Sequence, residues 1–139
     1  MMASPGAARD AYRAALEYAQ TRQQFGKPLA GYQLTQAKLA DMAVEIGNGQ
    51  LLALHVGRLK DAGRLQPHQI SMARLSNTRA ALRIAREARA MLGGNGITLD
   101  HSPMRHAANL ESVRTYEGTD EVHALVIGQT ITGIPAFRG

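Results

Sequence analysis

The chain has no cysteine and no tryptophan, and aromatic residues make up only 4% of it. Without cysteine it can form neither a disulfide framework nor a thiolate metal site, which fits a reducing compartment. We therefore expect the cytoplasm, or the mitochondrial matrix in a eukaryote. No apolar run approaches the length of about 18 residues that a membrane span needs, so none is predicted. A core poor in aromatics must be built from Ala, Leu, Ile, Val and Met, a composition typical of helices.

The charge balance is basic, with 16 Lys and Arg and a formal net charge of +5. Such a balance raises the question of nucleic acid. However, the densest basic cluster, Arg79 to Arg89, has the spacing of a helix face, and Arg83 precedes Glu87 at i,i+4. Aromatic residues for base stacking are nearly missing. We interpret the cluster as a solvated or subunit-facing stripe and expect no nucleic-acid partner.

Helix start and stop signals divide the chain into helices and short loops. Ser4-Pro5, Pro67, Ser102-Pro103 and Thr119 are good helix starts, and glycines follow the expected ends. We expect helices over residues 4–22, 31–62, 67–92, 102–113 and from 119 to about 132. The strand-like segment 97–99 is too short to support a sheet. The 139 residues therefore predict one all-α domain, an antiparallel four-helix bundle.

Metal and hydrolase chemistry have little support in the sequence. The five histidines include no pair at i,i+3 or i,i+4, and no HExxH is present, so no metal site is expected. No Gly-x-Ser-x-Gly elbow accompanies the serines. One carboxylate has a more suggestive place, since Glu117 lies on a Gly-containing turn before a helix start. Most such carboxylates are merely solvated.

Three motifs occur in order along the chain. Residues 22–29 read Arg-Gln-Gln-Phe-Gly-Lys-Pro-Leu, residues 92–97 read Leu-Gly-Gly-Asn-Gly-Ile, and residues 115–119 read Thr-Tyr-Glu-Gly-Thr. Each is weak alone, because Arg22 can complement a helix dipole and Gly93-Gly94 can end a helix. Together with Gln33-Leu34 they resemble the C-terminal domain of acyl-CoA dehydrogenases, over about residues 8–137. Residues 105–111 and the ending at 131–137 look most like the glutaryl-CoA dehydrogenase branch.

The resemblance implies a reaction. In this family a carboxylate removes the α-proton of an acyl-CoA thioester while the β-hydrogen leaves as hydride to FAD. Glu117 matches that base, and Tyr116 and Gly118 match positions that meet the substrate, here possibly glutaryl-CoA. The Glu117 N–H is expected to polarise the thioester carbonyl. The motifs specify neither the acyl chain, nor decarboxylation, nor the electron acceptor.

The resemblance also implies how FAD is held, in a cleft between domains and across a subunit contact. Arg22 matches the arginine that meets the pyrophosphate, and Phe25 and Gln33 match further cofactor contacts. The remaining expected FAD contacts are Gly93, Gly94, Thr119 and Glu121. Ala90 departs from the family, because many relatives have Gln there.

The chain matches only part of the family's architecture. The N-terminal helical domain and the central β domain of the family are absent from residues 1–139. We therefore expect the isolated domain not to retain FAD or to turn over substrate. Exposed apolar patches would drive it to form homodimers or homotetramers. The alternative is a non-catalytic helical oligomerisation module that keeps the fold and has lost the chemistry.

Overall fold

The structure is a computed structural model, and it describes residues 3–137. Its elements follow one another along the chain as α1 Ala3–Thr21, β1 Gln23–Gln24, β2 Lys27–Pro28, η1 Leu29–Gly31, α2 Gln33–Asp61, α3 Pro67–Met91, η2 Gly93–Ile97, α4 Ser102–Val113 and α5 Asp120–Thr132. The predicted all-α fold is confirmed. In the described part of the chain, the sheet consists only of the two short antiparallel strands.

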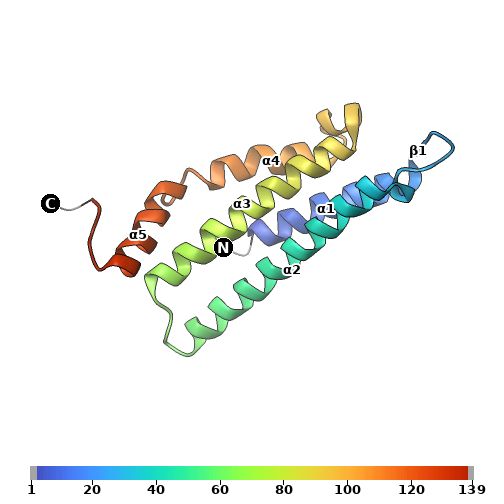
Figure 1. Ribbon diagram of the computed structural model, residues 1–139. Helices are drawn as coiled ribbons and strands as arrows, with labels where there is room; N and C mark the ends of the chain where they lie inside the picture. The colour runs from blue at the N-terminus through green and yellow to red at the C-terminus, as the bar shows by residue number, and fades with distance from the viewer. Residues whose placement is uncertain (1–2, 138–139) are drawn as a thin grey trace.

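The helices α1 to α4 lie side by side and alternate in direction, which makes the predicted antiparallel bundle (Figure 1). Helix α3 is central, because it contacts α1, α2, α4 and α5. Helix α5 lies across the first half of α3, beyond the end of α4. The β1–β2 hairpin and η2 lie together at the opposite end of the bundle. This layout separates the predicted site residues into two places.

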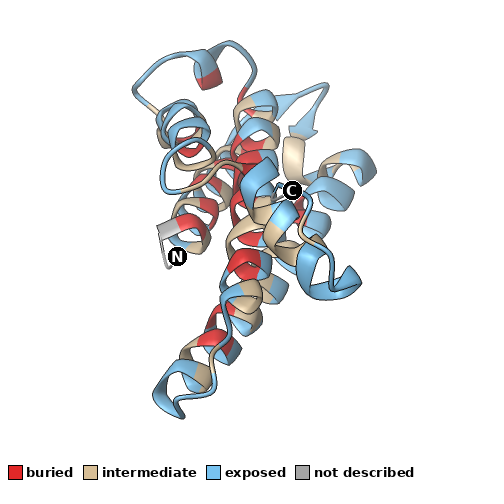
Figure 2. Ribbon diagram, turned by 90° about the vertical axis from the view of Figure 1, so that its left-hand side faces the viewer, coloured by how far each residue is buried: buried red, intermediate tan, exposed pale blue. Residues whose placement is uncertain are grey.

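The core is built largely from alanine. The buried alanines of α1 recur at helical spacing and face a matching set on α3. They are Ala8, Ala11, Ala15 and Ala19 on α1, with Ala73, Ala81, Ala85 and Ala88 on α3. Small side chains let the two helix axes approach closely, and Ile84, Leu92 and Leu110 fill the space between alanines. Figure 2 shows the buried residues on the faces where the helices meet.

Most helix ends agree with the sequence. Helix α3 begins at Pro67, and the Gln66 and Gln69 side chains form its capping box. Helix α5 has Thr119 as its N-cap, whose Oγ1 accepts from the Val122 N–H at 3.4 Å. The role predicted for Ser4 is wrong, because α1 already begins at Ala3. The Ser4 hydroxyl is buried and hydrogen-bonds the Thr78 hydroxyl at 3.3 Å.

Candidate functional site

The turn between α4 and α5 carries the expected base. Glu117 has a φ of 55° and Gly118 a φ of 97°, so two successive residues adopt left-handed backbone. A non-glycine residue in this region is strained, and such strain is common at functional sites. The Glu117 side chain is 76% exposed. The turn therefore presents an accessible carboxylate on a tightly folded backbone.

The side chain of Arg74, on α3, contacts this turn. Its Nη1 donates to Glu117 Oε2 at 3.0 Å, and its Nη2 donates to the backbone carbonyls of Val113, at 3.1 Å, and Tyr116. The guanidinium carbon lies 5.8 Å from the centre of the Tyr116 ring. The Arg74 side chain is only 17% exposed. One largely buried cation thus meets both the carboxylate and the backbone that carries it.

A buried carboxylate anchors the other end of the turn. Asp120, the first residue of α5, has a side chain that is 8% exposed. Its Oδ2 accepts from Arg79 Nε at 3.1 Å and from Arg114 Nε and Nη2 at 2.9 and 2.6 Å. Burial alone would raise the pKa of Asp120, but the hydrogen bonds from Arg114 and Arg79 outweigh it and lower this pKa. Asp120 therefore ties α5 to α3 and α4.

His123 fills the space behind Gly118. Its Nδ1 hydrogen-bonds the Ser71 hydroxyl at 3.1 Å, and a Cβ on Gly118 would meet its Nε2 at 3.3 Å. Burial lowers the pKa of His123, and the positive charge of Arg74 lowers it further. Both effects favour the neutral imidazole. Glycine at 118 is explained by both its backbone and this neighbour.

The expected FAD contacts after the base begin α5. Thr119 caps the helix, and Glu121 lies in its first turn with an exposed side chain. Its pKa is lowered mainly by a hydrogen bond from the Thr119 side chain, with a further contribution from its own backbone. Both residues therefore lie at the start of α5, directly after the turn that carries Glu117.

The other expected FAD contacts meet at the opposite end of the bundle. Arg22, directly after α1, lines an open pocket of about 340 Å³ together with Gly93 and Gly94 of η2. The Tyr18 hydroxyl, on the same pocket, accepts from Asn95 Nδ2 at 3.1 Å. Gly93 has a φ of 58°. The structure thus brings an exposed guanidinium beside a glycine backbone, two groups suited to a phosphate.

Phe25 and Gln33 lie near this pocket without lining it. Phe25 is at the tip of the β1–β2 hairpin, with a φ of 51° and an exposed fraction of 94%. Gln33 is the first residue of α2 and is also exposed. An aromatic ring so exposed is unusual unless another surface covers it.

The two groups of predicted residues are far apart. Glu117 pairs with Arg74 in the first half of α3, whereas Gly93 follows the last turn of that helix. The helix runs for 17 residues from Arg74 to Met91, which at 1.5 Å per residue is about 26 Å. One copy of the chain therefore holds the two groups of predicted residues in separate places along α3 (Figure 1).

Sequence patterns alone did not identify Arg74, Asp120 or Arg114. Their partners are distant in sequence or depend on how the helices turn. The expected Arg83–Glu87 pair is not the one that forms, because Arg83 pairs with Glu45 of α2 and Glu87 with Lys38 of α2. The arginine stripe is thus largely neutralised by acids on neighbouring helices.

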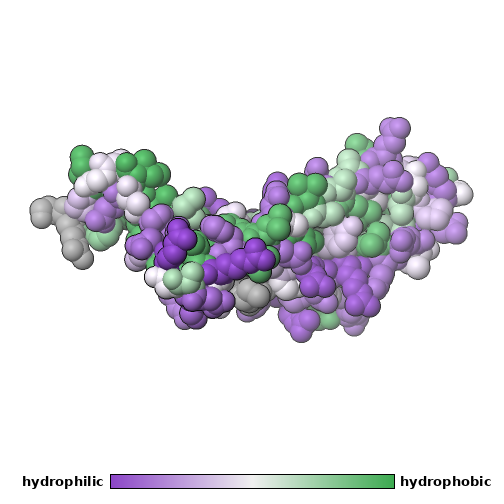
Figure 3. Space-filling view, turned by 90° about the horizontal axis from the view of Figure 1, so that it is seen from below, coloured by the Kyte–Doolittle hydropathy of each residue, from purple (hydrophilic) through white to green (hydrophobic). Residues whose placement is uncertain are grey.

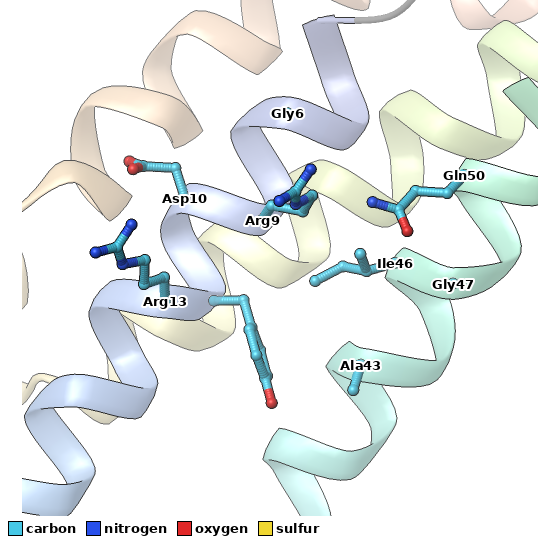
Figure 4. Close-up of a pocket in the computed structure, with 9 residues that line it drawn as sticks. Gly6, Arg9, Asp10, Arg13, Ala43, Ile46, Gly47 and Gln50 are labelled. Carbon is cyan, nitrogen blue, oxygen red and sulfur yellow. The ribbon is translucent and has the colours of Figure 1, made fainter.

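A separate open groove of about 740 Å³ lies between α1 and α2 (Figure 4). Arg9 and Gln50 approach it from the two helices. Asp10, on its rim, instead turns toward α4, where His106 Nε2 lies 2.7 Å from its Oδ2. None of the predicted site residues lines this groove.

Over residues 3–137, no three His, Asp or Glu side chains are grouped as a metal site would need. In that range no helix is both long and apolar enough to cross a membrane.

Comparisons with known proteins agree on one family. The family model described as "Acyl-CoA dehydrogenase, C-terminal domain" matches residues 1–132. Human mitochondrial short-chain specific acyl-CoA dehydrogenase is 37% identical over 122 residues, which are 88% of this chain and 30% of that protein. A crystal structure of glutaryl-CoA dehydrogenase from Mycobacterium smegmatis is 59% identical with a TM-score of 0.95, and the match covers 97% of this chain and 35% of that one. A crystal structure of a glutaryl-CoA dehydrogenase from the same organism in complex with FADH2 is 58% identical with a TM-score of 0.95, over 97% of this chain and 35% of that one. The chain thus spans about a third of the length of these relatives.

Proposed function

The chain belongs to the acyl-CoA dehydrogenase family, whose C-terminal domain it matches along nearly its whole length, and we propose that it supplies the catalytic base of an FAD-dependent enzyme of the glutaryl-CoA type. One observation carries the proposal. Glu117 holds an accessible carboxylate on a left-handed turn that arginines secure at both ends. A base needs this combination of a reachable oxygen and a fixed backbone.

Glu117 is the group that takes the α-proton of the acyl-CoA thioester. Substrate that covers this exposed carboxylate would exclude water from it and so favour proton transfer to it. Gly118 would leave room for the thioester beside the backbone, and the Glu117 N–H would donate to the developing oxyanion. Tyr116 packs over Arg74 and forms one wall of this substrate position.

The residues at the hairpin end fit the cofactor. Arg22 offers an exposed guanidinium, and Gly93 and Gly94 offer backbone without side chains, in one open pocket. We assign Arg22, Gly93 and Gly94 to the pyrophosphate, and Phe25 and Gln33 to neighbouring parts of FAD. Thr119 and Glu121 would meet it on the side of the base. When bound, FAD supplies the acceptor for the hydride that leaves the β-carbon.

The two groups of assigned residues lie about 26 Å apart along α3. We propose a homodimer or homotetramer in which the hairpin end of one copy faces the base of another, with further domains enclosing the cofactor. Exposed apolar side chains support association, among them Leu51 on α2 and Ile131 on α5, which are 66% and 78% exposed. In Figure 3 apolar side chains gather over the end of the molecule that α5 forms.

The test joins this chain to matching N-terminal and central domains. Glu117→Gln should retain FAD but lose most bleaching of the flavin by glutaryl-CoA, because the amide keeps the shape and cannot accept a proton. Glu17→Gln, at an exposed carboxylate paired with Arg13 on α1, is the matched control and should bleach normally. Full bleaching in Glu117→Gln would refute the assignment of the base.

Arg22→Ala should instead weaken FAD retention, since a charge-assisted contact to the pyrophosphate is lost. The competing function is a helical association module without chemistry, which the exposed apolar residues of α2 and α5 also support. Flavin absorbance of the joined protein separates the two. Absence of FAD there, with association intact, would favour the module.

A further inference from the structure

We propose that Arg74 is a positioning residue for the reaction, which holds the Glu117 turn in shape through the backbone rather than through the carboxylate. This inference rests on the proposed function, because it concerns the same base. Arg74 belongs to none of the three sequence motifs, and it lies on α3, 43 residues before Glu117.

Arg74 contacts backbone carbonyls as well as the Glu117 carboxylate. Its Nη2 donates to the carbonyls of Val113 and Tyr116, which are acceptors at the C-terminal end of α4 and in the turn after it. A helix end leaves its last carbonyls without partners in the helix, and a buried cation is a strong donor to them. Arg74 thus closes the end of α4 and sets where the chain turns.

Arg74 and Glu117 differ in how far their side chains are buried. The Arg74 side chain is 17% exposed, whereas that of Glu117 is 76% exposed. Water screens and competes for the carboxylate end of this ion pair, so that contact is weak and can break when the carboxylate turns toward a substrate. The contact with the Val113 carbonyl is partly buried, so water competes for it less. The base can therefore move while its backbone stays in place.

The turn that carries Glu117 has a backbone conformation that its surroundings must hold. Glu117 and Gly118 both have positive φ values, and such backbone persists only where its surroundings enforce it. The Asp120 cluster secures the C-terminal side of the turn, and Ser71 and His123 support Gly118 from behind. On the N-terminal side, the Thr115 hydroxyl donates to the Glu111 carbonyl within the same segment at 3.0 Å, whereas Arg74 donates to the Val113 and Tyr116 carbonyls from another helix. A planar fork suits two diverging acceptors, which a lysine can satisfy only in part.

The experiment uses the 139-residue chain and amide hydrogen exchange. The probes are the amides of Thr115 and Tyr116, which donate to the Ser112 carbonyl, and that of His123, which donates to the Thr119 carbonyl. Arg74→Gln should raise exchange at Thr115 and Tyr116 about tenfold, because local opening no longer breaks a charge-assisted hydrogen bond. His123, on the Asp120 side, should change less. Arg74→Lys should restore part of the protection.

Two further variants locate the effect. Glu117→Gln should leave the exchange of Thr115 and Tyr116 within about twofold of the original, because it removes only the exposed pair. Arg13→Gln removes an exposed guanidinium paired with Glu17 and should also leave the turn unchanged. The inference is overturned if Arg74→Gln leaves exchange at the turn unchanged, or if Glu117→Gln raises it equally. If Arg74→Gln does not fold, unchanged exchange in Arg74→Lys overturns it.

The joined enzyme gives an independent readout. There Arg74→Gln should lower kcat about tenfold and leave KM for glutaryl-CoA within about twofold, with partial rescue by Arg74→Lys, because orientation of the base is lost and substrate binding is kept. Equal kcat in both enzymes would overturn the positioning role. If the joined protein holds no FAD, the proposed function fails, while the exchange result still decides what Arg74 does to the turn.

Discussion

Asp120 offers the sharpest test of how the turn is anchored. Its carboxylate is almost fully buried and accepts three hydrogen bonds from Arg79 and Arg114 through one oxygen. Asp120→Asn keeps the shape of the side chain and removes the charge. The two arginines would then face a neutral amide oxygen, which accepts hydrogen bonds from them more weakly than a carboxylate does. We expect a clear loss of folding stability.

The size of the loss follows from the burial of each partner. Breaking a fully buried ion pair costs about 3–5 kcal/mol, and an exposed pair is worth less than about 1 kcal/mol. Here the acid is 8% exposed, but the Arg79 and Arg114 side chains are 54% and 34% exposed. The intermediate value is about 2 kcal/mol at pH 7, equivalent to a fall in Tm of about 5 °C for a chain of this length.

The pH dependence has a definite sign. The pKa of Asp120 is lowered from its ordinary value of 3.8, so its contribution is complete above that value and is lost as the pH falls through the folded pKa. The original chain should therefore lose part of its stability below about pH 4. Asp120→Asn lacks that contribution at every pH. The difference between the two proteins should shrink on acidification.

Urea unfolding followed by circular dichroism, at pH 7 and at pH 3, measures both effects. Protein concentration must be the same throughout, because association changes apparent stability. Glu17→Gln, at an exposed ion pair on α1, is the control and should be indistinguishable from the original at pH 7. A difference between Asp120→Asn and the original that is absent at pH 7, or equal at both pH values, would refute the anchoring argument.

Further predictions concern packing, association and the isolated chain. Gly96→Ala should destabilise the folded chain by about 3 kcal/mol or more, because the new Cβ would lie 2.1 Å from the Arg89 carbonyl oxygen. Gly57→Ala in α2, where a Cβ would meet nothing within 4 Å, should instead stabilise it by about 0.5–1 kcal/mol. Equal shifts of Tm in the two variants would contradict this. Light scattering should find dimers or tetramers, and Ile131→Glu on α5 should shift them toward monomer, since a charge then replaces an exposed apolar contact; a monomer throughout the micromolar range would refute association. The isolated chain should not retain stoichiometric FAD by absorbance after purification, because one wall of a cleft leaves the flavin open to water.

The helices and the motif-bearing turns were predictable from the sequence because their signals are local. Pro67 begins α3, Thr119 caps α5 and Gly133 ends that helix with a φ of 73°, each through contacts within a few residues. The same locality predicted a turn at Glu117. No such signal predicts which helix face is buried. Ile70 of α3 and Leu34 of α2 are large apolar side chains on helices, yet they are 42% and 79% exposed.

The amino-acid sequence by itself determined that this chain folds as helices and carries the ordered motifs of its family, because capping, periodicity and glycine turns act between near neighbours. Only the tertiary structure decided which charges meet. Arg83 pairs with Glu45 of α2 and not with Glu87 of its own helix, and Arg74 pairs with Glu117, which lies 43 residues later in the chain. These pairings depend on the rotation and crossing of packed helices, which the closely packed alanines of α1 and α3 set. The same packing holds the two groups of predicted site residues about 26 Å apart along α3.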